Sequence, residues 1–241
     1  MIRGSHHGTY LHRVGAYLEQ MYAAEDHSIL EAATLLADSI DSGGVLHTFG
    51  TGHSGLVAAE PSYRAGGLAA VNFLGILPGN TGWAAALEIE NDPEPAERLI
   101  REGGVRPGDV VAIVSHSGRS PLVLAAAEGA VKAGASVLAF TASTRNALAG
   151  HATLVLETGA PADDCAMSSP VHPYGSISSI LTLMLLNAVI AGTVGILIQR
   201  GRDLPVLESV HAEGGPAHNE RIMAPLAARI PCWTRMPCIE T

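Results

Sequence analysis

The chain has 241 residues, of which 47% are hydrophobic and 15% charged, and this is enough apolar mass for one domain with a large core. Its formal net charge of −9 and its 4% of aromatic residues argue against nucleic acid as a partner, because few cations could meet a phosphate backbone and few rings could stack on bases. The three cysteines are an odd number without a Cys-x-x-Cys pair, which favours reduced thiols and a cytoplasmic protein. The sequence suggests no cofactor.

The N-terminal region divides into a short tail and a helical segment. Residues 1–8 are interpreted as a disordered tail or the remnant of an expression tag, and residues 9–241 as a single domain with a C-terminal extension. Apolar residues follow a helical period from residue 10 to residue 40, on two different faces, and this predicts two helices. The first face holds Val14, Leu18, Met21 and Tyr22, and the second holds Ile29, Ala33, Leu36 and Ile40.

A first glycine-rich loop, Gly50-Thr-Gly-His-Ser-Gly55, follows a predicted strand at residues 45–49. Gly52 allows a close approach between backbone and ligand, and Ser54 lies at the expected start of the next helix. The loop matches the Gly-x-Gly-x-x-Gly pattern of dinucleotide sites, but the acidic residue expected about twenty residues later is missing. We therefore favour a sugar phosphate as the ligand of this loop.

A second loop, Ser115-His-Ser-Gly-Arg-Ser120, follows a continuous apolar run at residues 110–114, as expected for a strand buried on both faces. Ser120 is suited to be a helix N-cap, and Pro121 is tolerated in the first turn of the helix predicted over residues 122–132. Hydroxyls, backbone N–H groups and the positive end of a helix then converge on one point. This arrangement predicts a phosphate site, although the lysine-bearing Walker pattern is absent.

Strands and helices alternate along the rest of the chain, which predicts a right-handed parallel α/β sheet. The further strands are expected at residues 70–73, 136–141 and 153–157, and the further helices at residues 83–90 and 96–102.

An uncharged run of nineteen residues, 180–198, is long enough to span a membrane. We favour a fully buried central helix, because the run is single and follows an α/β pattern that needs a covering layer. Its small residues also allow close helix contact, so we expect a homo-oligomer, a dimer or a tetramer, and no membrane. The C-terminal tail carries four candidate metal ligands, which are His211, Glu213, His218 and Asn219. Their mixed types favour solvated loop residues and no metal site.

The two loops together resemble those of the sugar isomerase (SIS) domain family, and the resemblance covers roughly residues 10–202. It implies a three-layer sandwich with a five-stranded parallel sheet, and a phosphosugar whose phosphate is bound by the second loop. Similar segments close over a neighbouring subunit's site in SIS enzymes, so the resemblance offers this role for the C-terminal tail as an alternative to a solvated loop. The residues that the resemblance assigns to phosphate or substrate binding are Gly52, Ser54, Ser115, His116, Ser117, Arg119 and Ser120.

Two regions offer a carboxylate that could remove a proton beside a sugar carbonyl. Glu60 resembles in its position the catalytic glutamate of phosphoheptose isomerase. The acidic segment Glu88-Ile-Glu-Asn-Asp92, followed by Ser117-Gly-Arg-Ser-Pro121, resembles N-acetylmuramic-acid-6-phosphate etherase, which draws its acid/base carboxylate from that segment. The resemblance favours Glu90, with Glu88 or Asp92 as alternatives. The chain departs from the etherase pattern at His53 and after Glu60, where an acidic stretch is replaced.

His53, His116 and His172 are the histidines expected to face the ligand, where an imidazole could open a hexose ring or assist a leaving hydroxyl. We place His53 and His172 with the catalytic group. Arg64 and Arg119 are candidate partners for a phosphate or carboxylate.

The leading hypothesis from these resemblances is an enzyme that acts on a 6-phosphorylated, N-acetylated hexosamine. Proton abstraction at C2 can lead to a ketose, to loss of a C3 lactyl ether, or to loss of a C3 hydroxyl. An N-acetyl group at C2 blocks simple ketose formation, so elimination is favoured, as in an N-acetylglucosamine-6-phosphate dehydratase. A phosphoheptose isomerase-like enzyme and a non-catalytic phosphosugar sensor are the alternatives.

Overall fold

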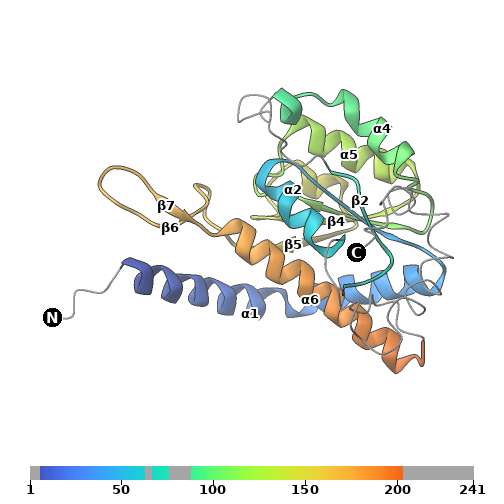
Figure 1. Ribbon diagram of the computed structural model, residues 1–241, viewed down its shortest axis with the longest axis horizontal. Coiled ribbons are helices and arrows are strands. Elements are labelled where there is room, and N and C mark those ends of the chain that lie inside the picture. Colours follow the sequence, from blue (N-terminus) through green and yellow to red (C-terminus); the bar gives the residue numbers. More distant parts are fainter. Residues whose placement is uncertain (1–5, 63–66, 76–87, 203–241) are drawn as a thin grey trace, which may run out of the picture.

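The computed structural model describes residues 6–62, 67–75 and 88–202, and it is a three-layer α/β sandwich (Figure 1). Five parallel strands form the middle layer in the order β2-β1-β3-β4-β5. The strands are β1 (Leu46–Gly50), β2 (Val71–Phe73), β3 (Val110–Val114), β4 (Ser136–Thr141) and β5 (Leu154–Glu157). The expected fold class and strand positions are confirmed, with shifts of one residue at some ends.

The central strand β3 is buried on both faces, as its unbroken apolar sequence predicts. Val110, Ala112 and Val114 belong to the core on one side of the sheet, and Val111 and Ile113 belong to the core on the other. Two helical layers supply the remaining core side chains. The first layer consists of α1 (His6–Asp41), α2 (Gly52–Ala59) and α6 (Ser178–Gln199), and the second of α4 (Glu94–Glu102) and α5 (Pro121–Lys132).

The N-terminal segment is one continuous helix of 36 residues, so the prediction of two helices is wrong. The two apolar faces occur because the partner of α1 changes along its length. Its C-terminal part packs in the core, where Ala32 and Leu36 are fully buried, while its N-terminal part contacts a β-hairpin through Tyr10 and Arg13. The helix begins at His6, so residues 6–8 of the expected tail or tag remnant are helical.

The hairpin that α1 contacts was not predicted from the sequence. Its strands, β6 (Cys165–Met167) and β7 (Tyr174–Ser176), have only three residues each and pair antiparallel. The hairpin projects from the body of the molecule beside the N-terminal half of α1 (Figure 1). It leads directly into α6, whose first turn is capped by Asp164: one carboxylate oxygen accepts the N–H groups of Ile177 and Ser178 at 3.3 and 2.6 Å.

The apolar run forms α6, and the expectation that this helix is fully buried is wrong. By length and composition α6 could cross a membrane, and 44% of its most apolar window is buried inside the chain. It packs against α1 and the sheet through residues such as Leu181, Leu185 and Val189. Met184 and Ile198 are about half exposed, at 53% and 54%. A strip of apolar surface on α6 is therefore left uncovered within one chain.

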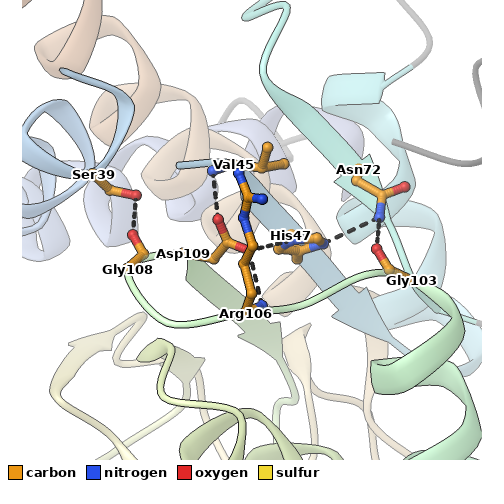
Figure 2. Close-up of polar contacts among 8 residues, drawn as sticks. All are labelled: Ser39, Val45, His47, Asn72, Gly103, Arg106, Gly108 and Asp109. Atoms are coloured by element: carbon orange, nitrogen blue, oxygen red, sulfur yellow. Dashed lines mark hydrogen bonds and ion pairs between the residues drawn. The ribbon is translucent and has the colours of Figure 1, made fainter. Parts of the chain in front are cut away.

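A buried polar network joins the amino ends of the strands (Figure 2). Asp109, His47 and Asn72 are all at most 2% exposed. The Asn72 amide donates to His47 Nδ1 at 3.1 Å and to the Gly103 carbonyl at 3.0 Å, which fixes its orientation and assigns the imidazole proton to Nε2. Nε2 faces Asp109 Oδ2 at 3.2 Å. The network joins β1, β2 and β3 to the end of α4, at the edge of the sheet opposite the two predicted loops.

Glu25 of α1 is a second buried acid, only 8% exposed, and within the part of the chain that the structure describes one of its carboxylate oxygens has no hydrogen-bond partner. Burial raises the pKa of Glu25 above its ordinary value of 4.5, and the Glu157 carboxylate adds to this, whereas hydrogen bonds from Ser28 and the Glu157 backbone act in the opposite direction.

The folded state therefore binds the Glu25 proton more tightly than the unfolded state does. This contribution to stability is present below pH 4.5 and is lost as pH rises through the higher folded-state pKa. We expect Glu25→Gln to raise the urea midpoint at neutral pH and to flatten the fall of stability as the pH rises above 4.5. A variant whose midpoint depends on pH as steeply as the wild type does would contradict this.

Candidate active site

The first loop, residues 50–55, and the second loop, residues 115–120, lie side by side at the carboxyl edge of the sheet. β1 and β3 are neighbours in register, with Gly50 opposite Val114, so the segments that follow them begin at the same level. The first segment leads into α2 and the second into α5, and both helices direct their positive ends to this edge. Ligands of open α/β sheets bind outside the carboxyl ends of the strands, and this is the expected place for an anion.

The second loop is shaped by its own hydroxyl and glycine. The buried Ser115 hydroxyl accepts the N–H of Gly118 at 3.1 Å, so this side chain stabilises the turn. Gly118 has φ +59° and lies against Asn146, so that a side chain there would collide with the amide. Ser117 and Arg119 are exposed at the edge and can reach a ligand. His116 is half-buried, and its Nδ1 is a buried atom that has no hydrogen-bond partner in residues 6–62, 67–75 and 88–202.

The first loop begins α2 at Gly52, whose φ is +53°, a conformation that favours glycine. Ser54 is buried in the first turn, whereas the His53 side chain is 57% exposed. His53 Nε2 lies 3.9 Å from Asp164 Oδ2, which links the loop to the residue that caps α6. Asp164 has φ +54°, and its part in the site was not anticipated.

Glu90 lies between the two loops. Residues 88–91, which include Glu90, are helical. The Glu90 Oε1 atom accepts a hydrogen bond from the Thr51 hydroxyl at 3.0 Å. A side-chain carbon at Gly52 would lie 2.8 Å from the same oxygen, so the carboxylate rests directly on the first loop. From the second loop, the Ser120 hydroxyl donates to the Glu90 carbonyl at 2.6 Å. Ser120 holds the N-cap position as expected, but it forms no cap bond.

The two alternatives to Glu90 in the acidic segment have different surroundings. The Glu88 side chain is exposed. Asp92 is also exposed, and its Oδ1 accepts the N–H of Glu94 at 3.0 Å in the first turn of α4. Only Glu90 of the three contacts both loops.

Glu60 and His172 are not brought to the loops within one chain. Glu60 follows the last residue of α2, about 12 Å along the helix from its start at a rise of 1.5 Å per residue. There its Oε2 accepts the Asn187 amide of α6 at 3.5 Å. His172 is exposed in the hairpin loop, where its backbone bonds to the Ser169 hydroxyl.

Other candidates cannot be placed. Arg64 and the four candidate ligands of the tail lie outside the described residues. Within residues 6–62, 67–75 and 88–202, no group of three or more His, Cys, Asp or Glu side chains is arranged to hold a metal ion.

Comparison with known proteins identifies the family of the chain. The family model of the SIS domain matches residues 9–142, more than half of the chain, and these residues contain both loops and Glu90. The chain belongs to the SIS domain family. A UPF0309 protein of Streptomyces avermitilis is 34% identical to this SIS protein over 234 residues, 88% of this chain and 92% of its own.

Solved structures support the same fold at low identity. Phosphoheptose isomerase from Neisseria gonorrhoeae superposes with a TM-score of 0.56 at 20% identity, covering 75% of this SIS chain and 92% of its own. The NanR protein of Vibrio vulnificus, solved in complex with ManNAc-6P, has a TM-score of 0.56 at 17% identity, with 83% of this chain and 66% of NanR covered. One neighbour is thus named as an isomerase, and another binds a phosphorylated amino sugar.

Proposed function

We propose that this SIS protein is a phosphosugar lyase that removes the C2 proton of a 6-phosphorylated N-acetylhexosamine and eliminates the C3 hydroxyl. The observation that carries the proposal is the Glu90 carboxylate, held against the first loop by Thr51 and joined to the second loop through Ser120. A base at this point lies beside both helix N-termini, where a phosphosugar would be anchored. The ManNAc-6P complex of NanR supports the ligand class.

The proposed reaction needs a base and a proton source. The second loop binds the phosphate, with Ser117, Arg119 and the N-terminus of α5 as donors. Glu90 takes the proton from C2 of the opened aldehyde sugar, and the bonding pair moves into the carbonyl as an enolate. The pair then returns and expels the C3 hydroxyl, which leaves as water after it receives a proton from His53. A C2–C3 double bond results. Glu60 and His172 take no part in this scheme within one chain.

The isomerase alternative differs only in the fate of the enolate. Reprotonation at C1 instead of loss of the C3 hydroxyl would give a ketose, and the phosphoheptose isomerase likeness favours that outcome for substrates without an N-acetyl group. A non-catalytic sensor would bind the phosphosugar without exchanging its C2 proton. Incubation with a panel of hexosamine 6-phosphates in D₂O, followed by NMR, tests all three: an unsaturated product supports the lyase, a ketose the isomerase, and neither product the sensor.

Ser117→Ala is expected to weaken phosphosugar binding. A hydrogen bond from a hydroxyl to a charged phosphate contributes about 1.5–3 kcal/mol, so the dissociation constant should rise about 10-fold to 100-fold. Titration calorimetry with N-acetylglucosamine 6-phosphate measures this. Ser169→Ala, in the exposed hairpin loop, is the control. Equal affinity in the wild type and Ser117→Ala would mean that the anion binds elsewhere.

We also propose that the protein is a cytoplasmic homo-oligomer, at least a dimer, in which the uncovered strip of α6 is buried against a second copy. The exposed apolar side chains of the first helical layer support this: Leu11, Tyr22 and Leu30 on α1 and Met184 on α6 are all more than half exposed. A covered strip would also explain an apolar helix without a membrane.

Light scattering at micromolar concentration should return a mass of at least two chains. Met184→Glu should lower it, because a buried carboxylate is costly at an apolar interface. A monomeric wild type, or recovery of the protein only in membranes, would contradict the proposal.

A further inference from the structure

Thr51 and Ser120 both hold helix N-cap positions, and neither caps its helix. Thr51 precedes α2 with an extended backbone (φ −127°, ψ 158°), and Ser120 precedes α5; no side-chain cap bond is formed at either. An N-cap hydroxyl normally accepts an N–H group from the first turn, and forgoing that bond costs helix stability. A local rule broken at a site is a sign of function.

Both hydroxyls instead donate to Glu90. Thr51 Oγ1 donates to the carboxylate Oε1 at 3.0 Å, and Ser120 Oγ donates to the backbone carbonyl at 2.6 Å. Thr51 is only 6% exposed, so its hydroxyl is removed from solvent. Among the residues that the structure describes, the other carboxylate oxygen of Glu90 accepts no hydrogen bond.

We infer that Thr51 is the positioning residue of the Glu90 carboxylate, with Ser120 fixing the backbone of the same residue from the second loop. One carboxylate oxygen is held by Thr51, and the other is directed to the substrate carbon. This inference rests on the proposed function of Glu90 as the base. Because both hydroxyls donate to Glu90, neither of them caps the first-turn N–H groups of its helix.

Valine and serine variants of Thr51 distinguish a positioning role of its hydroxyl from a packing role of its side chain. Thr51→Val keeps the shape of the side chain and its extended backbone but removes the donor, whereas Thr51→Ser keeps the donor. The matched control is Thr48→Val on β1, because Thr48 is fully buried and its hydroxyl has no hydrogen-bond partner among the described residues. The probe is N-acetylglucosamine 6-phosphate, followed by loss of its C2 proton signal in D₂O.

Thr51→Val is expected to lower kcat about 10²-fold with KM unchanged, as misplacement of a reacting group does. Thr51→Ser should recover most of the rate, and Thr48→Val should match the wild type. A kcat for Thr51→Val equal to that of the wild type would overturn the inference, as would a loss that Thr51→Ser does not recover.

A second measurement needs no turnover, and it separates this inference from the proposed function. The urea midpoints of Thr51→Val, Glu90→Ala and the double variant form a thermodynamic cycle. If Thr51 holds Glu90, Thr51→Val costs less stability in the Glu90→Ala background than in the wild type. Additive midpoints would overturn the inference even in an active enzyme. Absence of exchange in the wild type, together with non-additive midpoints, would instead count against the proposed function alone.

Discussion

Replacing Glu90 with glutamine is expected to lower the rate of C2 proton exchange by about 10²–10⁴-fold, the usual loss when a general base is removed. The amide keeps the size of the side chain and can still accept the Thr51 hydroxyl at Oε1, so the segment should stay between the loops. Affinity for N-acetylglucosamine 6-phosphate should therefore change little. Exchange of the C2 proton for deuterium, followed by NMR, gives the rate, and calorimetry gives the affinity.

Glu88→Gln is the matched control for Glu90→Gln. Glu88 lies two residues away on the same helical segment and is exposed. The Glu88→Gln variant should retain the wild-type rate of C2 proton exchange. Glu60→Gln measures any contribution to that rate from the Glu60 carboxylate at the far end of α2. If Glu90→Gln is as active as the wild type, or if Glu88→Gln is the variant that fails, the base has been assigned to the wrong carboxylate.

Asp109→Asn is expected to have the largest effect on stability of any single polar substitution considered. The Asp109 carboxylate accepts the N–H groups of Val45 and Arg106 at 2.9 and 3.0 Å and faces His47 Nε2 at 3.2 Å (Figure 2). An amide in its place offers one acceptor oxygen and turns an NH₂ group toward donors. Leaving a buried donor without its acceptor in this way costs about 1–3 kcal/mol, and more where the lost partner is charged.

Urea unfolding should show this loss for Asp109→Asn as a lower midpoint with an unchanged m-value. The control is Asp38→Asn, which removes an exposed carboxylate paired with Arg200 at 2.8 Å and should change the midpoint little. An Asp109→Asn midpoint equal to that of the wild type would mean that the network contributes nothing to the stability of the sheet.

The strands could be predicted because buried parallel strands leave a strong local pattern. The runs at β3 and β4 are continuous and apolar, and each is followed by a turn and then a helix or the next strand. Helix α1 was harder to predict, because two apolar faces along one segment arise equally from two helices or from one helix with two partners. The β6–β7 hairpin has strands of three residues and partners distant in sequence, such as Tyr10, so its pattern carries too little information.

The candidate site could also be predicted where its pattern is local, and could not be predicted where it depends on contacts between distant residues. The loops around Gly52 and Ser115 could be located, because glycine and hydroxyl residues between a strand and a helix N-terminus are the local pattern of an anion site. The preference for Glu90 came from resemblance, and its contacts with both loops now support that preference as a proposal. The bond from Thr51 to Glu90 could not be predicted, because it joins residues 39 positions apart.

The most direct test of the proposed chemistry is to mix the wild-type protein with N-acetylglucosamine 6-phosphate in D₂O and to follow the sugar by proton NMR. The lyase proposal predicts that the C2 proton signal disappears and that signals of a C2–C3 unsaturated product grow at the same rate as the substrate is consumed. An unchanged C2 proton signal, in a sample where calorimetry shows the sugar to be bound, would contradict it.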